Sequence, residues 1–197
     1  IFNNLGEWNA VIEAYEKNVV RIKIIEKVRD KDNEKSIWLA FSPIKQNPLN
    51  FLIQKSTELG INKFIPILSE RTVVREINIE RINKIIIEAG EQSNRISIPE
   101  VNKPESLKNF LYQFPKNGSL IFCDISSGKK SLKNILEKNI NGPVCILIGP
   151  EGDFSENEKK MKIDLNQTRS ISLAKNILKA ETAALSAITI VNYYLNL

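Results

Sequence analysis

The spacing of apolar residues changes along the chain, with one pattern near the N-terminus and another after residue 36. Residues 10–16 and 18–28 partly alternate between apolar and polar side chains and are rich in β-branched residues. This spacing predicts two strands of a β-hairpin or meander that turns at Lys17 and Asn18. Residues 29–36 form an uninterrupted polar run, which indicates either a linker or a solvated loop.

After residue 36, short apolar runs alternate with segments of helical period. The apolar runs are typical of strands buried on both faces, and they predict strands at residues 37–41, 64–68, 120–123, 144–148 and 170–173. Apolar residues at helical spacing predict helices at residues 49–59, 79–92, 105–113, 131–138 and 179–195. Ser155 and Glu158 have the spacing of a capping box, which predicts a further helix beginning there. This alternation predicts an α/β fold with a mostly parallel sheet and helices on both of its faces.

Composition narrows the possible chemistry. The 197 residues are 42% apolar and 26% charged, which is typical of a globular chain of one domain, or one domain with a small appendage. Histidine is absent, so nucleophile–histidine pairs and histidine-ligated metal sites are excluded, and we expect no metal. Cys123 and Cys145 both lie within apolar runs, which predicts two core thiols in a reducing compartment.

The net charge and the hydropathy of the chain indicate which kinds of partner it can bind. The formal net charge is +5, which permits a polyanionic partner without requiring one. No window approaches 18 apolar residues and no apolar signal segment opens the chain, so we expect no membrane partner and a cytoplasmic protein.

Two segments follow predicted strands, where parallel α/β sheets bind their ligands. The first is Gly149-Pro150-Glu151-Gly152, whose glycines permit a positive φ and a close approach of the backbone to a ligand. A plain connecting loop explains this turn equally well. The second segment is 170–184, in which Leu173, Ile177 and Leu178 form either an apolar slot or part of the core, and Glu181 and Thr182 fall in the first turn of a helix.

Two arginines stand near predicted element ends. Arg71 follows the strand at 64–68, and Arg95 follows the helix at 79–92. Arginine suits phosphate contact, although a surface arginine in solvent or in a weak ion pair explains each position too. The glycine-rich signatures GxGxxG and GxxxxGK[ST] are both absent from the sequence, so the two common phosphate-cradling loops are excluded.

Several strings together resemble one family. They are QKSTELG at 54–60, SERT at 69–72, EQSNR at 91–95, ILIGPEG at 146–152 and ILKAETA at 177–183. In this order and at this spacing they resemble the bacterial small-subunit ribosomal RNA uridine-N3 methyltransferases of the SPOUT (α/β-knot) superfamily.

The resemblance implies a fold, a cofactor and partners. Residues 36–197 would form a SPOUT methyltransferase domain with a C-terminal trefoil knot, and residues 1–35 would be part of a PUA-like, RNA-binding β-barrel. The earlier part of that barrel has no counterpart before Ile1. The implied cofactor is S-adenosyl-L-methionine, the implied assembly is a homodimer, and the implied partner is 16S rRNA in the small ribosomal subunit.

The resemblance also implies site residues. The cofactor would contact Leu147, Ile148, Gly149, Pro150, Glu151, Gly152, Ile171, Leu173, Ile177, Leu178, Glu181, Thr182 and Ala183. RNA would contact Arg71, Gln92, Arg95 and Lys179, and Arg71 and Arg95 are also the candidate catalytic residues. The chain departs from the family pattern where Asp153 and Ala174 replace glycines and where Asn176 and Lys179 replace arginines.

The implied reaction is transfer of a methyl group from S-adenosylmethionine to N3 of a uridine in 16S rRNA. How N3 loses its proton stays open. A carboxylate could accept the proton as a general base, or a cation could lower the pKa of the uracil electrostatically. Two alternatives remain: a truncated, catalytically impaired RNA-binding relative, and a SPOUT methyltransferase that acts on a different RNA nucleotide.

Overall fold

The computed structural model describes residues 1–3, 5–31, 35–123, 142–163 and 168–195. The helix predicted at residues 131–138 lies outside these ranges. Within them, no helix is long and apolar enough to cross a membrane.

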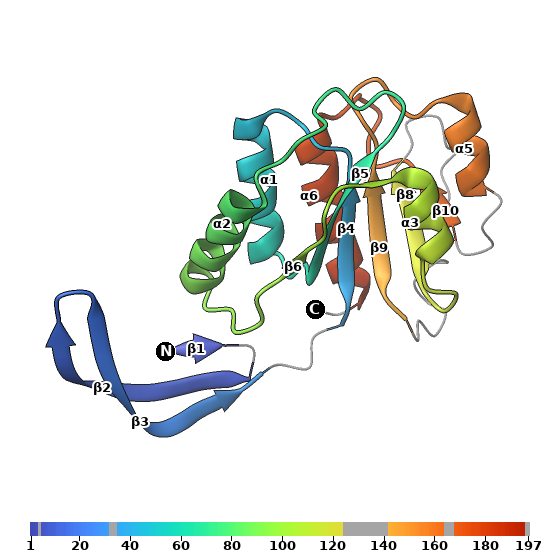
Figure 1. Cartoon of the computed structure of the whole chain (residues 1–197). Helices are drawn as coiled ribbons and strands as arrows, with labels where there is room; N and C mark the ends of the chain where they lie inside the picture. Colours follow the sequence, from blue (N-terminus) through green and yellow to red (C-terminus); the bar gives the residue numbers. More distant parts are fainter. Residues whose placement is uncertain (4, 32–34, 124–141, 164–167, 196–197) are drawn as a thin grey trace.

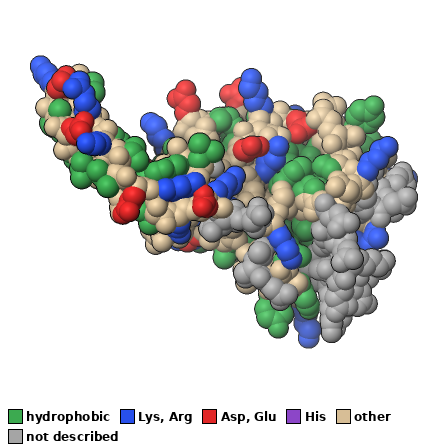
Figure 2. Space-filling model, turned by 90° about the horizontal axis from the view of Figure 1, so that it is seen from below, with side chains coloured by type: hydrophobic (Ala, Val, Ile, Leu, Met, Phe, Trp, Pro, Cys, Tyr) green, Lys and Arg blue, Asp and Glu red, His purple; other side chains and the backbone are tan. Residues whose placement is uncertain are grey.

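The first part of the chain forms a small antiparallel sheet that extends away from the rest of the molecule (Figure 1). Its strands lie in the order β1-β2-β3, with the bounds Phe2–Asn3, Gly6–Glu16 and Val19–Asp30. The predicted hairpin is confirmed, and its strands continue further than the apolar alternation indicated. Apolar, basic and acidic side chains are interspersed along this ribbon (Figure 2). The sheet is not a barrel, because β1 and β3 pair only with β2 in the part of the chain described.

The second sheet has seven strands, and every pairing described in it is parallel. The order is β10-β8-β9-β4-β5-β6, and β7 also pairs with β5. The bounds in chain order are β4 Ile37–Phe41, β5 Lys63–Leu68, β6 Glu100–Val101, β7 Glu105–Ser106, β8 Ser119–Cys123, β9 Val144–Ile148 and β10 Thr168–Ile171. The mostly parallel sheet is therefore confirmed. The last strand begins and ends two residues before the predicted one, because residues 172 and 173 turn toward a cavity described below.

The helices agree closely with the apolar spacing. They are α1 Gln46–Glu58, α2 Ile79–Gln92, α3 Leu107–Gln113, α5 Glu156–Ile163 and α6 Ala180–Leu195. The capping box before α5 is confirmed: Ser155 N donates to Glu158 Oε2 at 3.0 Å, and Glu158 N donates to Ser155 Oγ at 3.2 Å. Gly60, directly after the C-cap residue Leu59 of α1, has a φ of 92°, which an L-residue with a side chain rarely adopts.

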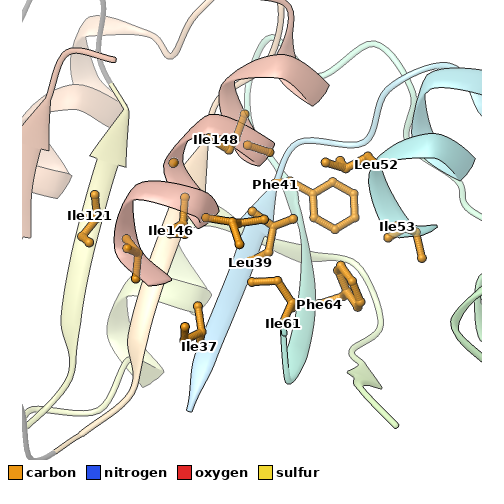
Figure 3. Packing of buried hydrophobic residues seen from close by; sticks show 14 of the residues in the cluster. Ile37, Leu39, Phe41, Leu52, Ile53, Ile61, Phe64, Ile121, Ile146 and Ile148 are labelled. Atoms are coloured by element: carbon orange, nitrogen blue, oxygen red, sulfur yellow. The ribbon is translucent and has the colours of Figure 1, made fainter. Parts of the chain in front are cut away.

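Helices cover both faces of the large sheet, as predicted. Side chains that alternate along a strand point to opposite faces, so Ile37, Leu39 and Phe41 of β4 pack on the side of α1, α2 and α6. Figure 3 shows these side chains meeting Leu52, Ile53 and other buried residues. Ala40 points to the other face, where α3 and the residues before α5 cover the sheet. The core therefore lies in two layers, and the sheet between them sets the positions of the loops at its strand ends.

Candidate functional site

A cavity of about 500 Å³ lies where β8 and β9 end and where the chain leaves β4 for α1. Two walls come from the two segments that the sequence singled out. The turn after β9 contributes Ile148, Gly149, Pro150 and Glu151, and the segment after β10 contributes Leu173, Ile177, Leu178, Glu181 and Ala183. Residues that are more than twenty positions apart in the sequence therefore line one space. The volume lies within the range of about 300–1,000 Å³ that is typical of small-molecule sites.

Four of the residues predicted for this site do not line the cavity. Leu147 and Ile171 are buried in the core, at 0% and 1% exposed, because alternate residues of a strand point into the sheet layers. Gly152 and Thr182 lie on the surface beside the cavity. The structure thus brings together nine of the thirteen predicted residues and leaves two in the core and two on the surface.

Position 149 requires a glycine because of side-chain packing and not because of its backbone conformation. A Cβ atom at this position would lie 2.7 Å from Cε2 of Phe154, whose side chain is fully buried. The positive φ that the sequence permitted at Gly149 and Gly152 is found at neither; in this turn the left-handed residue is Asp153, with a φ of 59°. The aromatic ring under Gly149 therefore fixes how close the turn lies to the sheet.

The negative charge that Asp153 adds to this turn is already paired. Its Oδ1 accepts a hydrogen bond of 2.7 Å from Phe154 N, and its Oδ2 lies 2.7 Å from Lys159 Nζ in α5. The hydrogen bond to Asp153 raises the pKa of Lys159 above its ordinary value. Ala174, the other replacement of a glycine, is not among the described residues with positive φ, so alanine meets no backbone strain there.

The cavity has a third wall that the sequence patterns did not reveal. Lys45 and Pro48, from the beginning of α1, and Cys123, the last residue of β8, complete the lining. Ser42 N donates to Ile148 O at 3.0 Å, which holds the segment after β4 against the turn after β9. The signal was available, because residue 45 also follows the carboxyl end of a predicted strand. Burial raises the pKa of the Cys123 thiol to about 12, so this thiol stays neutral and does not act as a nucleophile.

Arg95 does not have the exposed position that an RNA contact requires. Its side chain is buried, and Nη1 donates to Thr57 O at 2.8 Å and to Ile61 O at 2.7 Å. A further hydrogen bond of 3.3 Å runs from Nη2 to Ser97 Oγ. The guanidinium therefore binds carbonyl groups of the turn that ends α1, where Gly60 N also donates to Thr57 O at 3.1 Å. This burial and these hydrogen bonds support a structural role for Arg95, and its role as a catalytic or RNA-binding residue stays a prediction.

Arg71 and Lys179 do lie next to the cavity. Arg71 is exposed, and its Nη1 donates to Gly152 O at 2.8 Å, so it stands beside the turn after β9. Lys179 is exposed and lines the cavity directly before α6. Gln92 is exposed at the end of α2 and is not part of the cavity lining.

Comparison with known proteins identifies the family. A family model described as an RNA methyltransferase domain matches residues 31–192, which include the whole large sheet and the cavity. The chain belongs to this RNA methyltransferase family. The resemblance found in the sequence is thereby confirmed.

Named relatives and solved structures agree with this assignment. Ribosomal RNA small subunit methyltransferase E of Rickettsia conorii is 36% identical over 191 residues, which are 95% of this chain and 77% of the relative. The protein of the same name from Mesomycoplasma hyopneumoniae is 32% identical, covering 87% of this chain and 76% of the relative. A crystal structure of ribosomal RNA small subunit methyltransferase E from Neisseria gonorrhoeae, bound to S-adenosyl methionine, superposes with a TM-score of 0.86 at 28% identity, over 98% of this chain and 81% of that one.

A further solved structure has a similar fold. The methyltransferase Lpg2936 from Legionella pneumophila, described as a complex with the bound cofactor SAM, has a TM-score of 0.80 at 28% identity, covering 94% of this chain and 78% of that one. The cavity of this RNA methyltransferase offers backbone polar groups of a tight turn on one wall and apolar side chains on another. Such a mixture can bind both the edge and the faces of a purine ring.

Proposed function

We propose that this chain transfers the methyl group of S-adenosylmethionine to N3 of a uridine in the 16S rRNA of the small ribosomal subunit. The observation that carries the proposal is the single cavity formed by the turn after β9 and the segment after β10, in a chain of the RNA methyltransferase family. The names of the curated relatives support the substrate, and this substrate would place the reaction in the cytoplasm.

The cavity residues fit S-adenosylmethionine. Backbone N–H and C=O groups of residues 148–151 would bind the adenine edge, Leu173, Ile177 and Leu178 would contact its faces, and Glu181 with Ala183 would close the site. Leu147, Gly152, Ile171 and Thr182 would support this arrangement without lining it. When bound, the cofactor supplies an electrophilic methyl group on a sulfonium centre. The protein's own contribution would be to orient the base, to exclude water and to favour loss of the N3 proton.

The proposal extends to the chain topology, the domain division and the RNA contacts. We propose that the C-terminal segment is threaded as a trefoil knot, which the adjacent positions of β8, β9 and β10 in a parallel sheet support. Residues 1–35 would be part of a PUA-like RNA-binding domain and residues 36–197 the methyltransferase domain; the family match from residue 31 onward supports this division. Arg71, Lys179 and Gln92 would contact the RNA.

A homodimer is the proposed assembly. Helices α1 and α6 lie side by side (Figure 1), and they carry exposed apolar side chains at Phe51 and Tyr193, which are 47% and 76% exposed. Ile177, 80% exposed, adds to this surface at the cavity. Apolar side chains of this kind are buried when two copies associate. Sedimentation of the purified chain would measure the mass of the assembly, which should be that of two copies.

The deciding experiment measures binding and transfer separately. Calorimetry with S-adenosylmethionine tests the cavity, and incorporation of a tritiated methyl group into small ribosomal subunits tests the reaction. Ile177→Asp should weaken cofactor binding about tenfold or more, because the loss of one apolar contact and the added charge together exceed 1.4 kcal/mol. Tyr112→Asp is the matched control, since Tyr112 is 92% exposed on α3 at the other face of the sheet.

The outcomes separate the candidate functions. Binding with transfer to a uridine N3, identified by mapping the modified nucleotide, supports the proposal. Binding without transfer would favour the catalytically impaired RNA-binding relative, and a modified nucleotide of another kind would favour a different specificity. Absence of cofactor binding would overturn the proposed function.

A further inference from the structure

Lys45 occupies a distinct place in the cavity. It is the residue before the first turn of α1 and lines the cavity together with Pro48, whereas the proposed cofactor contacts come from the two other segments. The hydrogen bond from Ser42 N to Ile148 O holds this stretch against the turn after β9. Lys45 therefore lies on a wall of the cavity that the proposed cofactor contacts do not use, so that a second ligand could contact it.

The surroundings of Lys45 favour a negative charge. Its side chain is exposed, and no hydrogen bond or ion pair joins its ammonium group to another of the described residues. Helix α1 has no side-chain cap and no acidic residue in its first turn, so the positive end of its dipole adds to the charge of Lys45. An anion bound here would be stabilised by both.

The other charged and titratable groups of the cavity do not cancel this effect. Asp153 is paired with Lys159, and the thiol of Cys123 is neutral at ordinary pH. Glu151 lies on the exposed turn after β9, Glu181 lies in the first turn of α6, and Lys179, a second cation, also lines the cavity. Lys45 is thus a cation at the cavity wall, on a different segment from the two carboxylates.

We infer that Lys45 is a catalytic residue that stabilises the negative charge of the uracil ring when N3 loses its proton. This inference rests on the proposed function. The N3–H bond breaks and its proton passes to water at the open mouth of the cavity, leaving the electron pair on N3 and the charge spread over the ring oxygens. That electron pair then forms the bond to the methyl carbon, while the electrons of the sulfur–carbon bond return to sulfur. The negative charge of the ring and the positive charge of the sulfonium disappear together.

The test compares Lys45→Gln and Lys45→Arg with the wild type and with Lys108→Gln, a control at an exposed position of α3. Methyl transfer to small ribosomal subunits is measured between about pH 6 and pH 10. Lys45→Gln should be slower by on the order of 10²-fold at low pH, as for loss of one charge-stabilising group. The loss should shrink to a few-fold at high pH, because the base then ionises without help. Lys45→Arg should keep most of the rate, since it keeps the charge.

Two further measurements do not depend on the pH profile. Subunits that contain 5-fluorouridine, whose N3–H is more acidic, should show a smaller defect with Lys45→Gln. Calorimetry should give the same affinity for S-adenosylmethionine in wild type and variant. A tenfold weaker cofactor affinity would instead assign Lys45 to the carboxylate of the cofactor, and an equal loss at every pH with a raised KM for subunits would assign it to an RNA phosphate. Either result overturns the inference, whereas absence of binding and transfer in the wild type overturns the proposed function itself.

Discussion

Arg29 of β3 donates hydrogen bonds of 2.8 and 2.9 Å to the side-chain and main-chain oxygens of Asn94, which lies just after α2. Its Nε atom also donates to Glu7 Oε2 at 2.7 Å. Asn94 has a φ of 57°, a conformation that asparagine adopts more readily than most residues. One guanidinium therefore joins both long strands of the N-terminal sheet to the end of a helix in the large domain.

Removing this contact should loosen the N-terminal sheet without unfolding the protein. In Arg29→Ala we expect faster amide hydrogen exchange across residues 6–30 and a loss of unfolding free energy of no more than about 1 kcal/mol, because the pair is partly exposed. The conservative variant Arg29→Lys would keep the charge, but its single ammonium group could not reach all three acceptors. Unchanged exchange in β2 and β3 of Arg29→Ala would contradict this role.

Gly149→Ala should strain the turn beside the cavity. The added methyl group would meet the ring of Phe154 at 2.7 Å, and overpacking of this kind costs about 1–3 kcal/mol of unfolding free energy. Gly152→Ala is the matched control, because the nearest atom to its Cβ would be Arg71 Cδ at 3.8 Å. Urea unfolding of the two variants measures the difference, and equal stability would show that the Phe154 ring moves aside freely.

Arg95→Ala should reduce stability and should not act through RNA. The carbonyl group of Ile61 loses its guanidinium donor, while that of Thr57 keeps the hydrogen bond from Gly60 N. This loss costs about 1–3 kcal/mol of unfolding free energy. The exposed Arg71 offers the comparison: Arg71→Ala should leave the unfolding free energy within about 0.5 kcal/mol and weaken binding of small ribosomal subunits. A stable Arg95→Ala with weakened RNA binding would reverse this assignment.

The two thiols, Cys145 in the core and the partly buried Cys123 at the cavity, should make stability depend on alkaline pH. Burial raises the pKa of Cys123 from 9.0 to about 12 and raises that of Cys145 as well. Below pH 9 the thiols are neutral in both folded and unfolded chains, so they add no pH dependence. Above it they ionise more readily in the unfolded chain, and the unfolding free energy falls as pH rises toward 12.

Urea unfolding at about pH 8, 9.5 and 10.5 measures this dependence. Cys123→Ala should show a shallower decline than the wild type, whatever its absolute stability. Iodoacetamide should alkylate neither thiol of the folded protein at about pH 8 and both in urea. Rapid alkylation of the folded protein would contradict the neutral, buried state.

The strands and helices were largely predictable because each follows from local spacing. Residues 37–41, 79–92 and 144–148 have the predicted bounds, since their apolar residues face the two core layers. The pairs Glu100–Val101 and Glu105–Ser106 were missed because two residues are too few to show a period. Strand order also could not be derived from spacing, because it depends on contacts between distant segments.

The site was predictable only in part. The turn after β9 and the segment after β10 follow strands, and the general location of ligands in α/β sheets identified both. Lys45 was missed although it follows the carboxyl end of a predicted strand, because neither a glycine-rich turn nor an apolar segment marks that position. Arg95 was singled out because its string matched the family. Its burial could not be predicted, because the carbonyl groups that accept its hydrogen bonds lie more than thirty residues away in the sequence.

Strand β3 forms one border of its sheet in the part of the chain described, so its outer N–H and C=O groups are open to pairing with another strand. Arg21, Lys23, Glu26 and Lys27 interrupt the apolar side chains along it. Charges on such a border oppose stacking of one molecule on the next, as in many natural sheets. These charged residues would thus oppose aggregation through the border strand, and replacing them by neutral residues would make the protein more prone to aggregate.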